Sequence, residues 1–320
     1  VDIYAEVIEY GTKAGADVIL IETMQDSYEL KAAVLAAKEH SDLPVCATVV
    51  FDEKGKMLTG GTPESVVALL EGLHIDALGI NCSLGPRQIK PFVERMIQVS
   101  STPIIVTPNA GLPQTDDEGH TYYDMSADDF ALEMKEIASL NVHVLGGCCG
   151  TTPEYLSKTI ELVKDLPIEP PVKKNMSVVT SFSQSVEIGP KPVIIGERIN
   201  PTGKKKFKQA LRDGDINYIL SEGLKQEDAG AHILDVNVGL PEIDEPKMMV
   251  EVMKKLQSVI ALPLQIDTSD PIALEAALRH YNGKAMINSV NGKQESMDAV
   301  FPLVQKYGGV VVGLALDEDG

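Results

Sequence analysis

The sequence predicts an α/β protein made of two (β/α)8 barrels of the TIM type in tandem, each incomplete in this chain. Short aliphatic and β-branched runs alternate with longer segments of helical periodicity, which is the pattern of βα units on a parallel sheet. Polar and cysteine residues follow many of these runs, at the strand ends where barrel enzymes carry their chemistry. A segment rich in proline and serine divides the pattern into two halves.

The first half, residues 1–165, is expected to hold five strands with helices between them. It opens in a helical pattern at residues 4–17, and further helices are predicted at 27–40 and 127–140. Since a closed barrel needs eight strands, about three are expected to be missing at the start. The strands are predicted at residues 17–22, 44–51, 76–82, 103–109 and 141–147.

Residues 166–192 are predicted to be a linker, because prolines, serines and polar residues interrupt any periodicity there. The second half, residues 193–320, then repeats the βα pattern and is expected to lack about three strands at its end. Two open, doubly wound five-stranded sheets are the alternative. The strands are predicted at residues 192–200, 231–239, 262–270, 284–292 and 308–316.

Composition excludes several classes of partner. With 28 Lys and Arg against 47 Asp and Glu, the net charge of -19 argues against nucleic acid and anionic membranes. The apolar runs are far shorter than the roughly 20 residues that span a bilayer, so no membrane segment is predicted. Four cysteines in 320 residues cannot form a secreted disulfide framework, which favours a reducing cytoplasm.

Three of the four cysteines come directly after predicted strands: Cys82 in GINCSLG, and Cys148 and Cys149 in GGCCGTT. Neighbouring parallel strands bring their carboxyl ends to one rim, so these thiols are expected to converge. Three thiolates suit Zn²⁺ with a fourth position open for substrate. A tight turn of small residues explains GGCC equally well. Cys46, inside a predicted strand, is interpreted as a small buried hydrophobic residue.

The segments GINCSLGP, TPNAGLP and GGCCGTTPEY resemble the zinc-dependent homocysteine S-methyltransferase family. The resemblance implies that Cys82, Cys148 and Cys149 bind zinc and that Asn109 lies near the metal, filling the open position when substrate is absent. It also implies that Glu22 of IETMQD binds the amine of homocysteine; an ordinary carboxylate at a helix start is the alternative. The first strand and glycine-containing loop of that family have no counterpart here, which leaves the pocket incomplete.

Carboxylate and amide side chains also gather at strand ends in the second half, at Asp235, Asn237, Asp267 and Asn288. A pterin ring presents paired donors that a carboxylate accepts, and an edge that an amide can bind. Many other polar rings would fit as well. The residues alone therefore predict a site for a polar small molecule.

GERINPTG, LDVNVG, IDTSD and INSV look like the pterin-binding barrels that dihydropteroate synthases share with methyltetrahydrofolate-binding domains. GERINPTG is the methyltransferase variant of the first strand and argues against a dihydropteroate synthase. The resemblance implies that Asp267 and Asn288 hold the pterin ring. It places Asn200, Asp235 and Asn237 close to that ring.

The order of the two barrels resembles the N-terminal end of the cobalamin-dependent methionine synthase family. That resemblance implies methyl transfer from 5-methyltetrahydrofolate through cobalamin to zinc-activated homocysteine, giving methionine and tetrahydrofolate. No DxHxxG pattern for cobalamin occurs in the sequence, so the cobalamin domain is expected in another segment or a separate protein. The alternatives are another zinc-thiol, corrinoid or folate methyltransferase, and a folate-binding module with structural zinc.

Overall fold

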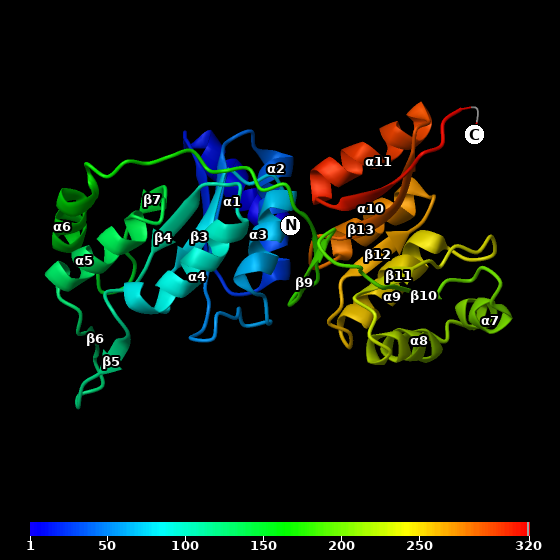
Figure 1. The fold of residues 1–320 in the computed structure, drawn as a ribbon, viewed down its shortest axis with the longest axis horizontal. Coiled ribbons are helices and arrows are strands. Elements are labelled where there is room, and N and C mark those ends of the chain that lie inside the picture. The colour runs from blue at the N-terminus through cyan, green and yellow to red at the C-terminus, as the bar shows by residue number, and fades with distance from the viewer. Residues whose placement is uncertain (319) are drawn as a thin grey trace. The chain divides into compact units, whose positions relative to one another are not determined.

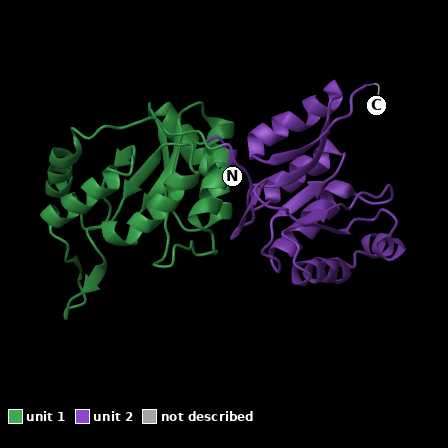
Figure 2. Ribbon diagram, in the orientation of Figure 1, with its two compact units in different colours: residues 1–71, 75–174 green, residues 72–74, 175–320 purple. Residues whose placement is uncertain are grey.

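The computed structural model describes residues 1–318 and 320. Over this part of the chain two compact units form, one from residues 1–71 and 75–174 and the other from residues 72–74 and 175–320 (Figure 2). Each unit contains one five-stranded parallel sheet accompanied by helices (Figure 1). The predicted α/β class is confirmed.

The sheet of the first unit has the strand order β1-β2-β3-β4-β7, so each parallel strand lies beside the next one along the chain. A short antiparallel hairpin, β5–β6, interrupts the connection after β4. The strands are β1 Ile19–Met24, β2 Val45–Val49, β3 Ala77–Asn81, β4 Ile104–Thr107, β5 Pro113–Thr115, β6 Thr121–Tyr123 and β7 Val144–Leu145. The helices are α1 Asp2–Lys13, α2 Ser27–His40, α3 Pro63–Gly72, α4 Pro86–Val99, α5 Ala127–Ala138 and α6 Pro153–Val163.

The second unit repeats this arrangement with the order β10-β11-β12-β13-β14. An antiparallel hairpin, β8–β9, precedes it. The strands are β8 Ser177–Thr180, β9 Ser185–Ile188, β10 Ile195–Ile199, β11 Ile233–Val236, β12 Leu264–Asp267, β13 Met286–Asn291 and β14 Val310–Leu314. The helices are α7 Lys205–Asp213, α8 Ile216–Asp228, α9 Glu245–Gln257, α10 Pro271–His280 and α11 Gln294–Tyr307.

The strand order identifies both sheets as arcs of (β/α)8 barrels. In both sheets, strands that are consecutive in the sequence are also neighbours in space. Right-handed crossovers between such strands place all the helices on one side of the sheet, as in a barrel. A doubly wound sheet instead reverses its strand order at a switch point, and neither sheet does. The doubly wound alternative is therefore wrong. Five of the eight strands of a barrel are present in each unit over the described residues, so each barrel is incomplete in this chain.

Local sequence explains where the elements begin and what they bury. Asp26 accepts hydrogen bonds from the backbone N–H groups of Tyr28 and Glu29 at 2.8 and 2.7 Å, which caps the start of α2. Helix α2 then packs on β1 and β2 through a buried face that includes Leu30 and Val34. These contacts fix the sheet whose strand ends carry the first candidate site.

The β8–β9 hairpin lies within the segment predicted to be a linker and was not indicated by the sequence. Its Val179 is fully buried against Ile233 and Met286, the first residues of β11 and β13. The Tyr281 hydroxyl donates to the Thr180 carbonyl at 2.7 Å. The hairpin therefore covers the amino ends of the second sheet, opposite the strand ends with the polar residues. None of the helices in the described part of the chain is both long and apolar enough to cross a membrane.

A candidate metal centre and a second polar cavity

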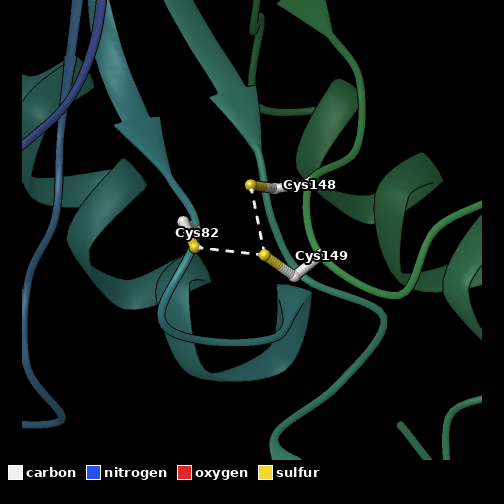
Figure 3. A group of neighbouring side chains, drawn as sticks. All are labelled: Cys82, Cys148 and Cys149. Carbon is white, nitrogen blue, oxygen red and sulfur yellow. Dashed lines mark hydrogen bonds between the residues drawn. The ribbon is translucent and has the colours of Figure 1, made fainter. Parts of the chain in front are cut away.

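The structure brings Cys82, Cys148 and Cys149 together at the carboxyl ends of β3 and β7 (Figure 3). The Sγ atom of Cys149 lies 3.7 Å from that of Cys82 and 3.9 Å from that of Cys148. All three sulfurs lie within 4.8 Å of one another. Cys46 is not a member of this group, in agreement with its predicted position inside a strand.

The donor set and its spacing fit zinc. Two sulfurs bound to tetrahedral zinc, each about 2.3 Å from the ion, stand about 3.8 Å apart. The two shortest sulfur separations in the cluster match this spacing. Among the described residues the group consists of three cysteines, which would leave one tetrahedral position for another ligand. A turn of small residues at GGCC does not by itself account for the approach of Cys82.

The cysteine pair is held by its loop. The Cys148 N–H donates to the Pro108 carbonyl at 2.7 Å, and the Thr151 hydroxyl donates to the Cys148 carbonyl at 2.7 Å. Gly150 has φ +81°, and a Cβ there would lie 2.4 Å from the ring of Tyr123, so glycine is required for both conformation and space. Thr152 is the N-cap of α6, but its side chain makes no capping hydrogen bond.

Asn109 lies beside Cys148 and Cys149, and its side chain contacts the backbone of Cys149. Its side chain is 2% exposed, and its Oδ1 accepts a hydrogen bond from the Cys149 N–H at 3.1 Å. Its own N–H donates to the Leu84 carbonyl at 3.0 Å. Asn109 therefore links the loop after β3 to the loop after β7, and its carboxamide orients Cys149.

Glu22 lies on the rim of the same sheet, at an irregularity near the end of β1 where the register with β2 shifts. The adjacent Thr23 is bonded to Asn81, the residue before Cys82, through both its backbone N–H and its hydroxyl. Asn81 was not among the predicted site residues. Its place at the end of a buried strand, directly before the cysteine in GINC, is the signal that could have identified it.

The Cys148 thiol resists ionisation when no cation is present. Burial raises the pKa of the Cys148 thiol to about 12, and the neighbouring Cys82 and Cys149 raise it further in the same direction. A metal ion must therefore displace the proton of Cys148, which this thiol holds tightly at neutral pH.

Zinc affinity is accordingly expected to increase with pH. Zinc requires thiolates, whereas the metal-free Cys148 thiol stays protonated well above neutrality, so displacement of its proton changes the apparent affinity by about tenfold per pH unit. Chelator competition between pH 6 and 8.5, with the released protons counted in weak buffer, measures this dependence. An affinity independent of pH over that range would contradict binding through these thiols.

The second candidate site centres on Asp267, the last residue of β12. Its Oδ2 accepts hydrogen bonds from Asn237 Nδ2 at 3.0 Å and from Asn200 Nδ2 at 3.3 Å. Asn288, its partner in the adjacent strand β13, lines a cavity of about 440 Å³ together with Asp267. Four of the predicted residues thus meet at the carboxyl ends of β10 to β13.

Asp235 lies beneath this group, 3% exposed, and Gln265 Nε2 donates a hydrogen bond to its Oδ1. Burial raises the pKa of Asp235 to about 6, and the negative charges of Asp267 and Glu197 act in the same direction, while the bond from Gln265 opposes them. Gln265 was not predicted, because in the sequence it is a lone amide between the apolar residues Leu264 and Ile266 of β12.

Asp235→Asn is expected to stabilise the protein above pH 6. Because the carboxyl pKa is raised in the folded state, ionisation destabilises the fold; this penalty is absent below about pH 4 and grows until about pH 6. The rise in the pKa of Asp235 from its ordinary value to about 6 corresponds to a destabilisation of the fold of about 3 kcal/mol once the carboxyl group is ionised. Thermal denaturation of the parent protein and of Asp235→Asn from pH 4 to 8 measures the difference in stability. An equal difference in stability at pH 4 and pH 8 would contradict a raised pKa for Asp235.

Family models match both units. The model of homocysteine S-methyltransferase matches residues 1–163, and the model of pterin binding enzyme matches residues 196–319. Among curated proteins, a methionine synthase of Mycobacterium tuberculosis (strain ATCC 25618 / H37Rv) is 32% identical over 337 residues, and one of Mycobacterium leprae (strain TN) is 31% identical over 342. Each alignment covers 100% of this chain but 28% of the relative, so the chain spans less than a third of their length.

Among solved structures, the apo form of the homocysteine methyltransferase MmuM from Escherichia coli aligns with 49% of this chain and 57% of its own. The sequence identity is 20% and the TM-score is 0.39.

Proposed function

Because the chain belongs to the homocysteine S-methyltransferase family, we propose that it transfers methyl groups to homocysteine, with 5-methyltetrahydrofolate as the donor and cobalamin as the carrier between them. Residues 1–165 would hold the thiol site and residues 193–320 the folate site. The products would be methionine and tetrahydrofolate. The cobalamin would come from another segment or protein, since the sequence contains no DxHxxG pattern.

In the first unit, Cys82, Cys148 and Cys149 would hold zinc. When bound, zinc supplies a Lewis acid that favours the thiolate form of the homocysteine sulfur at neutral pH. Glu22 would bind the homocysteine amine by charge-assisted hydrogen bonding, on the rim that also carries Cys82. Asn109 would keep Cys149 in orientation through the bond to its backbone N–H. These residues would bind and align the thiol for attack on the methyl group.

In the second unit, the Asp267 carboxylate would accept the paired donors of the pterin ring, and Asn288 would bind the adjoining edge. Asn200 and Asn237 would hold the carboxylate in orientation, since both amides donate to its Oδ2. Asp235 would lie near the ring. Protonation of N5 makes the amine of methyltetrahydrofolate a leaving group, as general acid catalysis requires.

The observation that carries this proposal is the cluster of three cysteine sulfurs. Three sulfur ligands would leave the fourth tetrahedral position of zinc for the substrate. X-ray absorption at zinc, with and without homocysteine, tests it. The expected result is three sulfur neighbours in the free protein and a fourth with homocysteine. An unchanged zinc shell would reject the catalytic role and favour structural zinc.

A second candidate is a methyltransferase that uses the same zinc site for a different thiol. It is supported by the fact that the residues matched to homocysteine recognition are few, with Glu22 the main one outside the cysteine cluster. Competition among small thiols for the fourth zinc position separates the two. Preference for homocysteine over thiols that lack its amine supports the first proposal.

A further inference from the structure

The carboxamide of Asn81, a residue with no part in the proposed chemistry, joins three strand ends of the first sheet. Asn81 is the last residue of β3 and is 1% exposed. Its Nδ2 donates to the Thr23 hydroxyl at 2.6 Å, and its Oδ1 accepts from the Thr23 backbone N–H at 3.0 Å and from the Thr48 hydroxyl at 2.9 Å. One buried side chain therefore ties β1, β2 and β3 together at their carboxyl ends.

The chain segments beside these bonds have unfavourable backbone conformations. The φ angles are +62° at Thr23, +58° at Cys82 and +64° at Ser83. Residues with a Cβ rarely adopt such left-handed conformations, and a β-branched residue such as threonine does so least readily. They persist where surrounding interactions determine them. The bonds from Asn81 to Thr23, and the anchoring of β3 directly before Cys82, supply that constraint.

The constrained segments carry two of the candidate site residues. Glu22 precedes Thr23, and Cys82 follows Asn81. The register of β1 with β2 shifts between Ile21 and Met24, and an irregularity of this kind redirects the side chains next to it. Because the same carboxamide fixes both segments, a change at Asn81 would displace the cysteine and the carboxylate together.

We propose that Asn81 is a positioning residue that sets Cys82 for zinc and Glu22 for the homocysteine amine. This inference rests on the function proposed for the first unit. Asn81 would act through hydrogen bonds to the strand ends and would contact neither zinc nor substrate. Metal affinity and amine recognition would therefore depend on a single buried amide.

Asn81→Ala removes all three hydrogen bonds and tests the proposal. Loss of a residue that orients a metal ligand is expected to weaken zinc binding about 10- to 100-fold, measured by chelator competition. The KM for homocysteine should rise as well, and the thiolate-to-cobalt absorption of the Co²⁺-substituted protein should change per bound ion. Thr48→Val is the matched control, because it removes one bond to the same Oδ1 without touching Thr23 or Cys82. It should lower the Tm and leave zinc affinity and the cobalt spectrum unchanged.

Ser83→Gly, introduced together with Asn81→Ala, should restore zinc affinity toward that of the parent, since glycine adopts a positive φ without steric cost. If Asn81→Ala fails to fold, Thr23→Val replaces it, because it removes the acceptor of the Nδ2 bond; it should raise the KM for homocysteine. Parental zinc affinity and cobalt spectrum in Asn81→Ala, or a parental KM in Thr23→Val, would overturn the proposal. Failure of the proposed function would look different, since the unsubstituted protein would then not bind homocysteine at zinc.

Discussion

Cys149→Ala is expected to abolish zinc binding and to lower the rate of methyl transfer to homocysteine by at least about 10³-fold. The Sγ of Cys149 is within 4 Å of both other sulfurs, so its loss removes the central member of the cluster. Under the proposed function zinc would supply both the thiolate form and the position of the homocysteine sulfur, and losing about 4 kcal/mol from these two effects corresponds to about 10³-fold, since each 1.4 kcal/mol is about a factor of ten. Zinc analysis of the purified protein and the rate of methionine formation measure the two effects.

Cys46→Ala is the matched control, since it makes the same change at a cysteine outside the cluster. It should keep zinc and activity. Methyl transfer from methyltetrahydrofolate to added cobalamin should also persist in Cys149→Ala, because the proposed function assigns that step to the second unit. If Cys149→Ala retained stoichiometric zinc, the assignment of the metal centre would be wrong.

Asp267→Ala is expected to weaken binding of methyltetrahydrofolate by about 10²-fold or more. Hydrogen bonds to a charged group contribute about 1.5–3 kcal/mol each, and the pterin ring would lose a pair of them. The change also leaves the side-chain amides of Asn200 and Asn237 without their shared acceptor, which disturbs the rest of the site. Equilibrium titration with methyltetrahydrofolate measures the affinity.

Asp244→Ala serves as the control for Asp267→Ala. Asp244 is an exposed carboxylate in the same unit whose side chain caps α9 by accepting from the Lys247 N–H. Its replacement should cost about 1 kcal/mol of stability and leave folate affinity unchanged. Equal loss of affinity in both variants would indicate general destabilisation and argue against a direct role for Asp267.

The sequence predicted the strands of both sheets because buried parallel strands are continuous apolar runs bounded by turns. The boundaries were less accurate: a strand was predicted at residues 17–22, whereas β1 extends over Ile19–Met24 through the irregularity at Thr23. The hairpins were missed for a physical reason. Strands β5 and β6 have three residues each and are largely exposed, so they carry no apolar periodicity.

The sequence predicted the site residues whose chemistry is distinctive. It did not predict the residues whose role depends on their position in the folded structure. Three cysteines after strands suggest a metal whatever the fold, and they do converge. Asn81 and Gln265 resemble ordinary polar residues in the sequence, and their importance depends on burial and on partners from other strands. Asn109 was predicted near the cluster, but its bond to the Cys149 backbone required the structure. Which of these residues act in the reaction stays a prediction.

The β8–β9 hairpin bears on the order of events at the second site. It covers the amino ends of the second sheet, whereas the cavity lined by Asp267 and Asn288 lies at the carboxyl ends of the strands. Under the proposed function, the methyl donor and the cobalamin that receives its methyl group would use the same entrance. Tetrahydrofolate could then depart only after the cobalamin had withdrawn, so that the undocking of one partner would gate the release of the other.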